Sequence, residues 1–138
     1  MKLLIVEDDR ILADMVGQYF RLHGVEGILL ATNLEDAIER LNCADGVLCD
    51  GSFPTSRPPS PESRTPSPNF GGVRSNWPHI AGLAQKRGIP FALFTGSEAA
   101  VAHARECGLA AFQKPFDTRQ ATDWLIEQLR SRETKTGN

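Results

Sequence analysis

The stretch KLLIVEDD, residues 2–9, decides the fold that this chain is expected to adopt. Its apolar run, Leu3 to Val6, is typical of a strand that is buried on both faces of a parallel sheet. Two acidic residues, Glu7 and Asp8, follow directly where that strand is predicted to end. Open α/β sheets bind their ligands at the carboxyl ends of their strands. The stretch therefore predicts both a sheet and the edge at which a site would lie.

The same alternation of apolar runs and helical spacing recurs along the rest of the chain. Further strands are predicted at Ile28–Leu30, Gly46–Cys49, Ile89–Phe94 and Leu109–Gln113. Helices are predicted at about 11–22, 34–41, 76–87, 98–107 and 118–132, with Asp9 and Asn33 as N-caps of the first two. Five strand–helix units in succession predict an α/β protein of the flavodoxin-like (βα)5 type, with a doubly wound five-stranded parallel sheet.

Composition narrows the classes of protein to consider. The 138 residues suit one domain, and the net charge of −2 gives no electrostatic case for direct nucleic-acid binding. No apolar run is long enough to span a membrane, so we expect a cytoplasmic protein without a membrane partner. The three cysteines show no CxxC spacing. We expect them to be reduced residues in or near the core, and the helical spacing also places Met15 there.

One segment breaks the alternation of strands and helices. Residues 55–68 read TSRPPSPESRTPSP, and Gly71-Gly72 follow shortly after. Proline removes backbone donors and fixes φ, so this segment cannot be a sheet interior or a regular helix. We therefore predict an exposed Pro/Ser/Gly-rich loop insertion at 55–72, after the third strand, inside a domain that covers 1–131. A polar tail is expected at 132–138.

Five residues with chemically useful side chains lie at the predicted strand ends. Glu7 and Asp8 follow the first strand, Asp50 the third, Thr95 the fourth and Lys114 the fifth. Mg²⁺ takes oxygen ligands, and one or two carboxylates with a phosphate satisfy it. A carboxylate such as that of Asp50 can attack phosphorus without a general base, while a lysine neutralises phosphoryl charge. The pattern predicts a pocket that accepts a phosphoryl group with the help of Mg²⁺.

Four motifs at these positions, KLLIVEDD, LCDGSFP, LFTGS and QKPF, carry a resemblance to a known family. Over roughly residues 1–131 the chain resembles the receiver domain of two-component response regulators. The resemblance implies that Asp50 accepts a phosphoryl group from a histidine kinase or a histidine phosphotransfer protein. It also implies that Asp8, Asp50 and the backbone carbonyl of Ser52 ligate Mg²⁺ with help from Glu7.

The resemblance has further implications for the site and its role. Thr95 and Lys114 would bind the phosphoryl group, and the bond between Lys114 and Pro115 would be cis. The protein would be a phosphorylation switch that changes binding to a downstream protein, with autophosphorylation and autodephosphorylation as its only catalysis. It would not be a metabolic enzyme. The sequence leaves open whether the domain acts alone or belongs to a longer regulator.

The chain departs from the family pattern at three places. The insertion lengthens the connection after the third strand, so the following helix is expected to be displaced or shortened. Ala111 stands where the family has an aromatic residue whose rotamer is coupled to the residue at the Thr95 position. The neighbouring Phe112 is expected to point to the other face of the sheet. The segment from Thr95 to Lys114 is short, so the fourth helix is expected to be abbreviated.

Two other functions are compatible with parts of the sequence. A receiver-like protein–protein interaction module that is never phosphorylated would keep the fold and use the loop for binding. A flavodoxin-like nucleotide or flavin binder would need a glycine-rich phosphate loop after the first strand, which is missing. For the receiver itself, we predict that the loop gates partner access, so that deleting Arg57 to Pro68 leaves the phosphorylation rate within a few-fold.

Overall fold

The computed structural model describes residues 1–57 and 73–136. Most of the predicted insertion, residues 58–72, and the last two residues of the predicted tail lie outside the described residues. The prediction that this loop gates partner access therefore stays a prediction.

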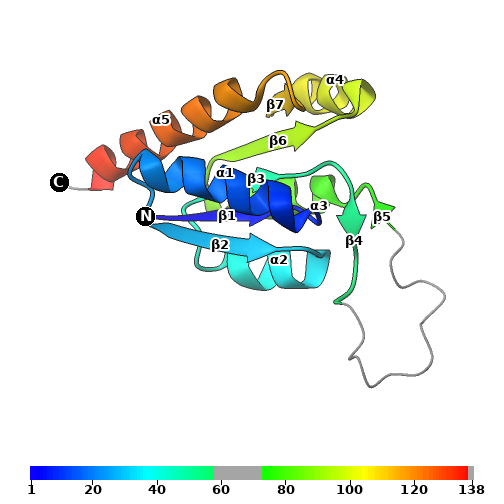
Figure 1. The fold of residues 1–138 in the computed structure, drawn as a ribbon, viewed down its shortest axis with the longest axis horizontal. Helices are drawn as coiled ribbons and strands as arrows, with labels where there is room; N and C mark the ends of the chain where they lie inside the picture. The colour runs from blue at the N-terminus through cyan, green and yellow to red at the C-terminus, as the bar shows by residue number, and fades with distance from the viewer. Residues whose placement is uncertain (58–72, 137–138) are drawn as a thin grey trace.

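The strands and helices follow the predicted order. The main sheet contains five parallel strands in the order β2-β1-β3-β6-β7, which is the strand order of a doubly wound flavodoxin-like sheet (Figure 1). These strands are β1 (Lys2–Val6), β2 (Gly27–Ala31), β3 (Gly46–Cys49), β6 (Phe91–Thr95) and β7 (Ala110–Gln113). The helices are α1 (Arg10–Leu22), α2 (Leu34–Leu41), α3 (Trp77–Arg87), α4 (Glu98–Glu106) and α5 (Thr118–Thr136). The predicted fold class is confirmed.

Two layers of helices cover the two faces of the sheet. Helices α1 and α5 pack on one face, where Phe20 and Leu125 are fully buried against Leu3. Helices α2, α3 and α4 pack on the other, where Ile80 is buried with Leu4. Alternate residues of β1 thus face opposite layers, which explains why its apolar run is continuous.

Local signals set the ends of several helices as predicted. The Asp9 carboxylate accepts hydrogen bonds from the backbone of Ile11 and Leu12, and the side chain of Asn33 caps α2 in the same way. Helix α3 ends at Gly88, whose φ of 68° lies in the left-handed region that favours glycine. Helix α4 has nine residues. Within the described residues, no helix is long and apolar enough to cross a membrane.

Some apolar residues lie elsewhere than predicted. Met15 is 63% exposed, and Ile11 and Leu22 lie on the same open side of α1, so the placement of Met15 in the core is wrong. Helical spacing finds an apolar face but cannot tell a buried stripe from a solvent-facing one beside it. Cys43 and Cys107 are likewise exposed, and Cys49 alone of the three cysteines is buried.

A short antiparallel hairpin that the sequence did not predict brackets the insertion. Its strands are β4 (Phe53–Pro54) and β5 (Val73–Arg74), and Figure 1 shows them beside the carboxyl edge of the main sheet. Asn76 fastens the hairpin, because its side-chain amide donates to the carbonyl of Phe53 at 2.8 Å and to the hydroxyl of Thr55 at 3.2 Å. The hairpin therefore fixes the two described segments that flank the insertion next to each other.

Arg57, the last residue of the insertion's described first part, is bound to the acidic side of α2. Its guanidinium pairs with Asp36 and Glu39, and its backbone N–H donates to the Glu35 carboxylate at 3.2 Å. Burial acts to raise the pKa of Asp36, but the hydrogen bonds from Arg57 and Asn33 outweigh it, and the pKa is lowered. The first residues of the insertion are thereby held against the fold.

Candidate functional site

The register of the sheet brings the predicted residues to one edge. Val6 of β1 lies beside Cys49 of β3, and the Asp50 N–H donates to the Val6 carbonyl at 2.8 Å. The residues that follow, Glu7 and Asp50, are therefore neighbours although they are far apart in the sequence. On the other side of β3, β6 pairs with β7, and the Lys114 N–H donates to the carbonyl of Thr95 at 2.8 Å.

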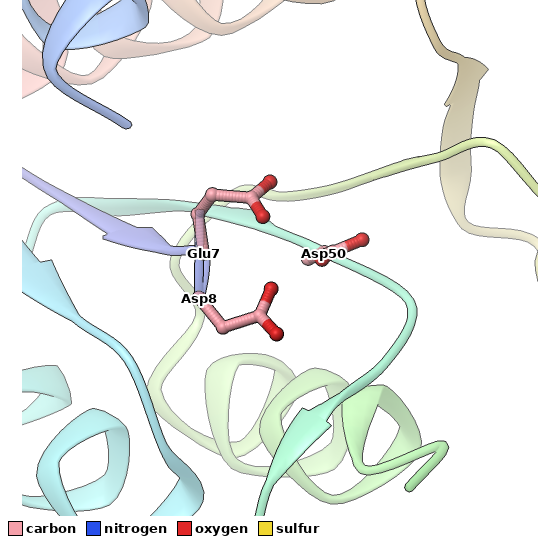
Figure 2. A group of neighbouring side chains, drawn as sticks. All are labelled: Glu7, Asp8 and Asp50. Atoms are coloured by element: carbon pink, nitrogen blue, oxygen red, sulfur yellow. The ribbon is translucent and has the colours of Figure 1, made fainter. Parts of the chain in front are cut away.

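Three carboxylates meet at this edge. Figure 2 shows the side chains of Glu7, Asp8 and Asp50 directed toward a shared space at the ends of β1 and β3. One carboxylate oxygen from each lies within 4.8 Å of the others. Glu7 is buried, Asp50 is half-buried and Asp8 is exposed, so the acidic group opens to solvent on the Asp8 side. This arrangement suits an oxygen-liganded cation that keeps some of its water.

Lys114 forms ion pairs with two members of this acidic group, Glu7 and Asp50. Its Nζ lies 2.5 Å from Oε2 of Glu7 and 3.3 Å from Oδ1 of Asp50, above the ring of Phe94 at 5.4 Å from the centroid. Burial acts to lower the pKa of this lysine, but the hydrogen bond to Glu7 and the charge of Asp50 outweigh it, so the pKa is raised. Lys114 is a fixed cation beside the candidate phosphoacceptor.

The pKa of Glu7 is raised to about 7. Burial of the carboxyl is the largest cause, and the negative charge of Asp50 adds to it, while Lys114 acts in the opposite direction. Its other oxygen, Oε1, accepts from the Asp9 N–H at 3.2 Å. A metal-free site thus holds Glu7 between its neutral and charged forms near pH 7.

The remaining predicted site residues lie around Asp50. Thr95 is buried at the end of β6, and its Oγ1 accepts from the Ser97 N–H at 3.2 Å. Ser97, and not Thr95, caps α4, because its hydroxyl accepts from the backbone of Ala100. Ser52 is half-buried between Asp50 and β4, and the role of its carbonyl as a metal ligand stays a prediction.

Ala111 and Phe112 lie on opposite faces of β7, as strand alternation predicts. Ala111 is buried on the α4 side of the sheet, and its carbonyl accepts from the guanidinium of Arg105 at 2.9 Å. Phe112 packs on the opposite side, with its ring 6.2 Å from that of Trp124. Phe112 therefore does not take the place of an aromatic side chain at 111. The predicted cis bond between Lys114 and Pro115 is confirmed.

Cys49, the residue before Asp50, is an inert part of this site. Burial raises the pKa of its thiol well above the usual value, and the negative charges of Asp50 and Glu7 raise it further. We predict that a maleimide labels two thiols of the native protein, Cys43 and Cys107, and a third only after unfolding. Mass spectrometry with peptide mapping checks this, and native labelling of Cys49 would contradict the buried position.

No protein-family model matches this sequence, and no curated protein matches it either. Solved structures do match it. A response regulator receiver domain protein (CheY-like) from Methanospirillum hungatei JF-1 is 18% identical with a TM-score of 0.67, and the match covers 97% of each chain. A putative response regulator from Chloroflexus aurantiacus J-10-fl is 22% identical with a TM-score of 0.68, over 94% of this chain and 97% of that one.

The likeness to these structures establishes a fold. A de novo designed Rossmann 2x3 protein also matches, at 13% identity and a TM-score of 0.62 over 94% of this chain and 90% of its own. The chain therefore has the fold of response regulator receiver domains, and this fold also occurs in proteins without their chemistry. What the site does must be argued from its own residues.

Proposed function

We propose that this protein is a receiver-type phosphorylation switch in which Asp50 is the phosphoacceptor. The observation that carries the proposal is the meeting of three carboxylates and one lysine at the carboxyl edge of a receiver-like sheet. The phosphoryl donor would be a phosphohistidine of a histidine kinase or of a phosphotransfer protein. The output would be altered binding of a downstream protein, and catalysis would be limited to the phosphorylation and dephosphorylation of the protein itself.

The acidic group fits the cation that this chemistry needs. Its donors are all oxygens, which suit Mg²⁺ better than softer metals. Asp8 and Asp50 would hold the ion directly with the carbonyl of Ser52, and Glu7 would bind one of its waters. When bound, Mg²⁺ would neutralise the clustered acids and the charge on the phosphoryl oxygens.

The protein's own residues would carry the transfer. A carboxylate oxygen of Asp50 forms a bond to phosphorus while the bond from phosphorus to the donor's nitrogen or oxygen breaks, and the donor leaves with the bonding electrons. No proton has to be removed from Asp50, because its carboxylate is already a nucleophile. Lys114 would pair with one phosphoryl oxygen, and the Thr95 hydroxyl would donate to another.

Intact-mass spectrometry after incubation with acetyl phosphate and Mg²⁺ tests the proposal. We expect one phosphoryl adduct, absent when EDTA replaces Mg²⁺ and removed by hydroxylamine, which cleaves acyl phosphates. A folded protein that gains no adduct and does not bind beryllofluoride would overturn the proposal.

We predict that Mg²⁺ affinity increases with pH, because Glu7 titrates with a pKa of about 7 and its neutral form attracts a cation less. Between pH 6 and 8 the charged fraction of Glu7 increases about tenfold, and this factor is the upper limit of the expected increase in the association constant. Isothermal titration calorimetry measures this. The Glu7→Gln variant is the control, and equal affinities at both pH values in the wild type would contradict the raised pKa.

Two observations favour a second function, the constitutive interaction module. Ala111 cannot report the state of Thr95 in the way that an aromatic side chain could, and exposed apolar residues on α1, Ile11 and Met15, could bind a partner in any state. Such a module would not need Mg²⁺. If the Trp fluorescence and amide NMR shifts of the protein ignore Mg²⁺ at pH 8, this second function is preferred.

A further inference from the structure

Gly51, the residue after the candidate phosphoacceptor, is a glycine for a reason other than backbone conformation. The glycines with positive φ in the described residues are Gly24, Gly88 and Gly108, so Gly51 has a backbone that other residues adopt. A side chain is excluded at position 51 because there is no room for it beside Thr95. A Cβ at this position would lie 2.6 Å from Oγ1 of Thr95 and 2.9 Å from its Cβ.

Thr95 has little freedom to make way for such a side chain. It is 5% exposed at the end of β6, and its hydroxyl accepts from the Ser97 N–H at 3.2 Å. Rotation about χ1 would carry Oγ1 away from position 51, but the Thr95 Cβ does not move in that rotation and would still lie 2.9 Å away. A methyl group at position 51 therefore requires the backbone of β6 or of the β3–β4 connection to shift.

Gly51 also forms a hydrogen bond with the candidate phosphoacceptor, Asp50. Its backbone N–H donates to Oδ1 of Asp50 at 2.7 Å, the oxygen that lies 3.3 Å from Lys114 Nζ. Gly51 thus orients the Asp50 carboxylate through its N–H. Because Gly51 has no side chain, it also leaves room for the Thr95 hydroxyl.

We infer that Gly51 is a positioning residue for phosphoryl transfer, because the space left by its missing side chain lets the Thr95 hydroxyl lie close to the acceptor carboxylate. The inference rests on the proposed function of Asp50. It predicts that Thr95 loses its place in the site when position 51 carries a side chain, while the metal-binding acids keep theirs.

The test is Gly51→Ala, with Gly96→Ala as the matched control because a Cβ at Gly96 meets nothing within 4 Å. We expect the rate of phosphorylation by acetyl phosphate to fall about tenfold to a hundredfold, since small misplacements of reacting groups cost that much. The Mg²⁺ dissociation constant should stay within about twofold when β6 and Thr95 move, because Thr95 is not a proposed ligand, whereas a shift of the β3–β4 connection would also move Asp50 and Ser52 and weaken Mg²⁺ binding. Equal rates for the two variants would overturn the inference, and so would a parallel loss of Mg²⁺ affinity.

The methyl carbon of Thr95 provides a readout that does not depend on phosphorylation. Its NMR resonance should move much further in Gly51→Ala than in Gly96→Ala, where only the ordinary effect of a changed sequence neighbour is expected, even if the wild-type protein accepts no phosphoryl group. An unmoved resonance would overturn the positioning role alone, whereas a wild type without an adduct would overturn the proposed function and leave only the steric effect of position 51 on Thr95.

A second pair of variants covers the case in which Gly51→Ala does not fold. The overlap is with the Thr95 side chain, so the loss of melting temperature caused by Gly51→Ala should largely disappear in a Thr95→Gly background. The same loss in both backgrounds would show that the side chain of Thr95 is not what excludes a residue larger than glycine.

Discussion

The Asp50→Asn variant is expected to gain no phosphoryl group from acetyl phosphate under conditions in which the wild-type protein gains one. An amide lacks the negative charge that makes the carboxylate oxygen a nucleophile and a metal ligand. The substitution changes little in shape, and the Gly51 N–H, 2.7 Å from Oδ1 of Asp50, can still donate to the amide oxygen. Intact-mass spectrometry measures the adduct, and melting temperature verifies that the variant is folded.

Asp45→Asn is the matched control for this variant. Asp45 lies just before β3, at the opposite end of the strand that delivers Asp50, and its carboxylate accepts from the backbone N–H of Lys2. The chemical change is the same, but the control should retain full uptake. A full adduct on Asp50→Asn would contradict the proposal and identify a different nucleophile.

The fold was predictable because its signals are local. The run from Leu3 to Val6 and the run from Gly46 to Cys49 are continuous in the sequence since both faces of their strands are buried. Asp9 and Asn33 cap helices through contacts within three residues.

The candidate site was predictable for a related reason. In a parallel sheet all strands run in the same direction, so residues just after the strands collect at one edge without any knowledge of the packing. The direction of the strands alone therefore predicts that Glu7 and Asp50 lie near each other. The pKa of Glu7 was not predictable, because it depends on burial and on the distances to Asp50 and Lys114.

The features that sequence reasoning missed depend on contacts between distant residues. The β4–β5 hairpin has strands of two residues, too short for any periodicity, and it is fastened by Asn76 from the far side of the insertion. Position 51 has no room for a side chain because of Thr95, which lies more than forty residues away in the chain.

The Lys114→Met variant is expected to be phosphorylated at least about a hundredfold more slowly than the wild type, since electrostatic groups aimed at developing charge contribute on this scale. Methionine keeps a long unbranched side chain over Phe94 but removes the cation that contacts Glu7 at 2.5 Å and Asp50 at 3.3 Å. The rate is measured from the growth of the intact-mass adduct. Lys86→Met, at an exposed position on α3, is the control and should keep the wild-type rate. A rate for Lys114→Met within threefold of the wild type would contradict the assigned role.

The stability of Lys114→Met separates two effects of the lysine. Without Mg²⁺, removing the cation leaves the Glu7 and Asp50 carboxylates without their ion-pair partner, and the free energy of unfolding should fall by about 1–3 kcal/mol because the site is only partly buried. Loss of Lys114, which acts to lower the pKa of Glu7, raises that pKa above 7. A raised carboxyl pKa means that deprotonation destabilises the folded state, so the deficit should be larger at pH 8 than at pH 6. Mg²⁺ should reduce the deficit at pH 8, because a bound cation shields the same acids, yet phosphorylation should stay slow. Recovery of both stability and rate with Mg²⁺ would instead mean that Lys114 acts only by neutralising the acids and makes no contact with the phosphoryl group.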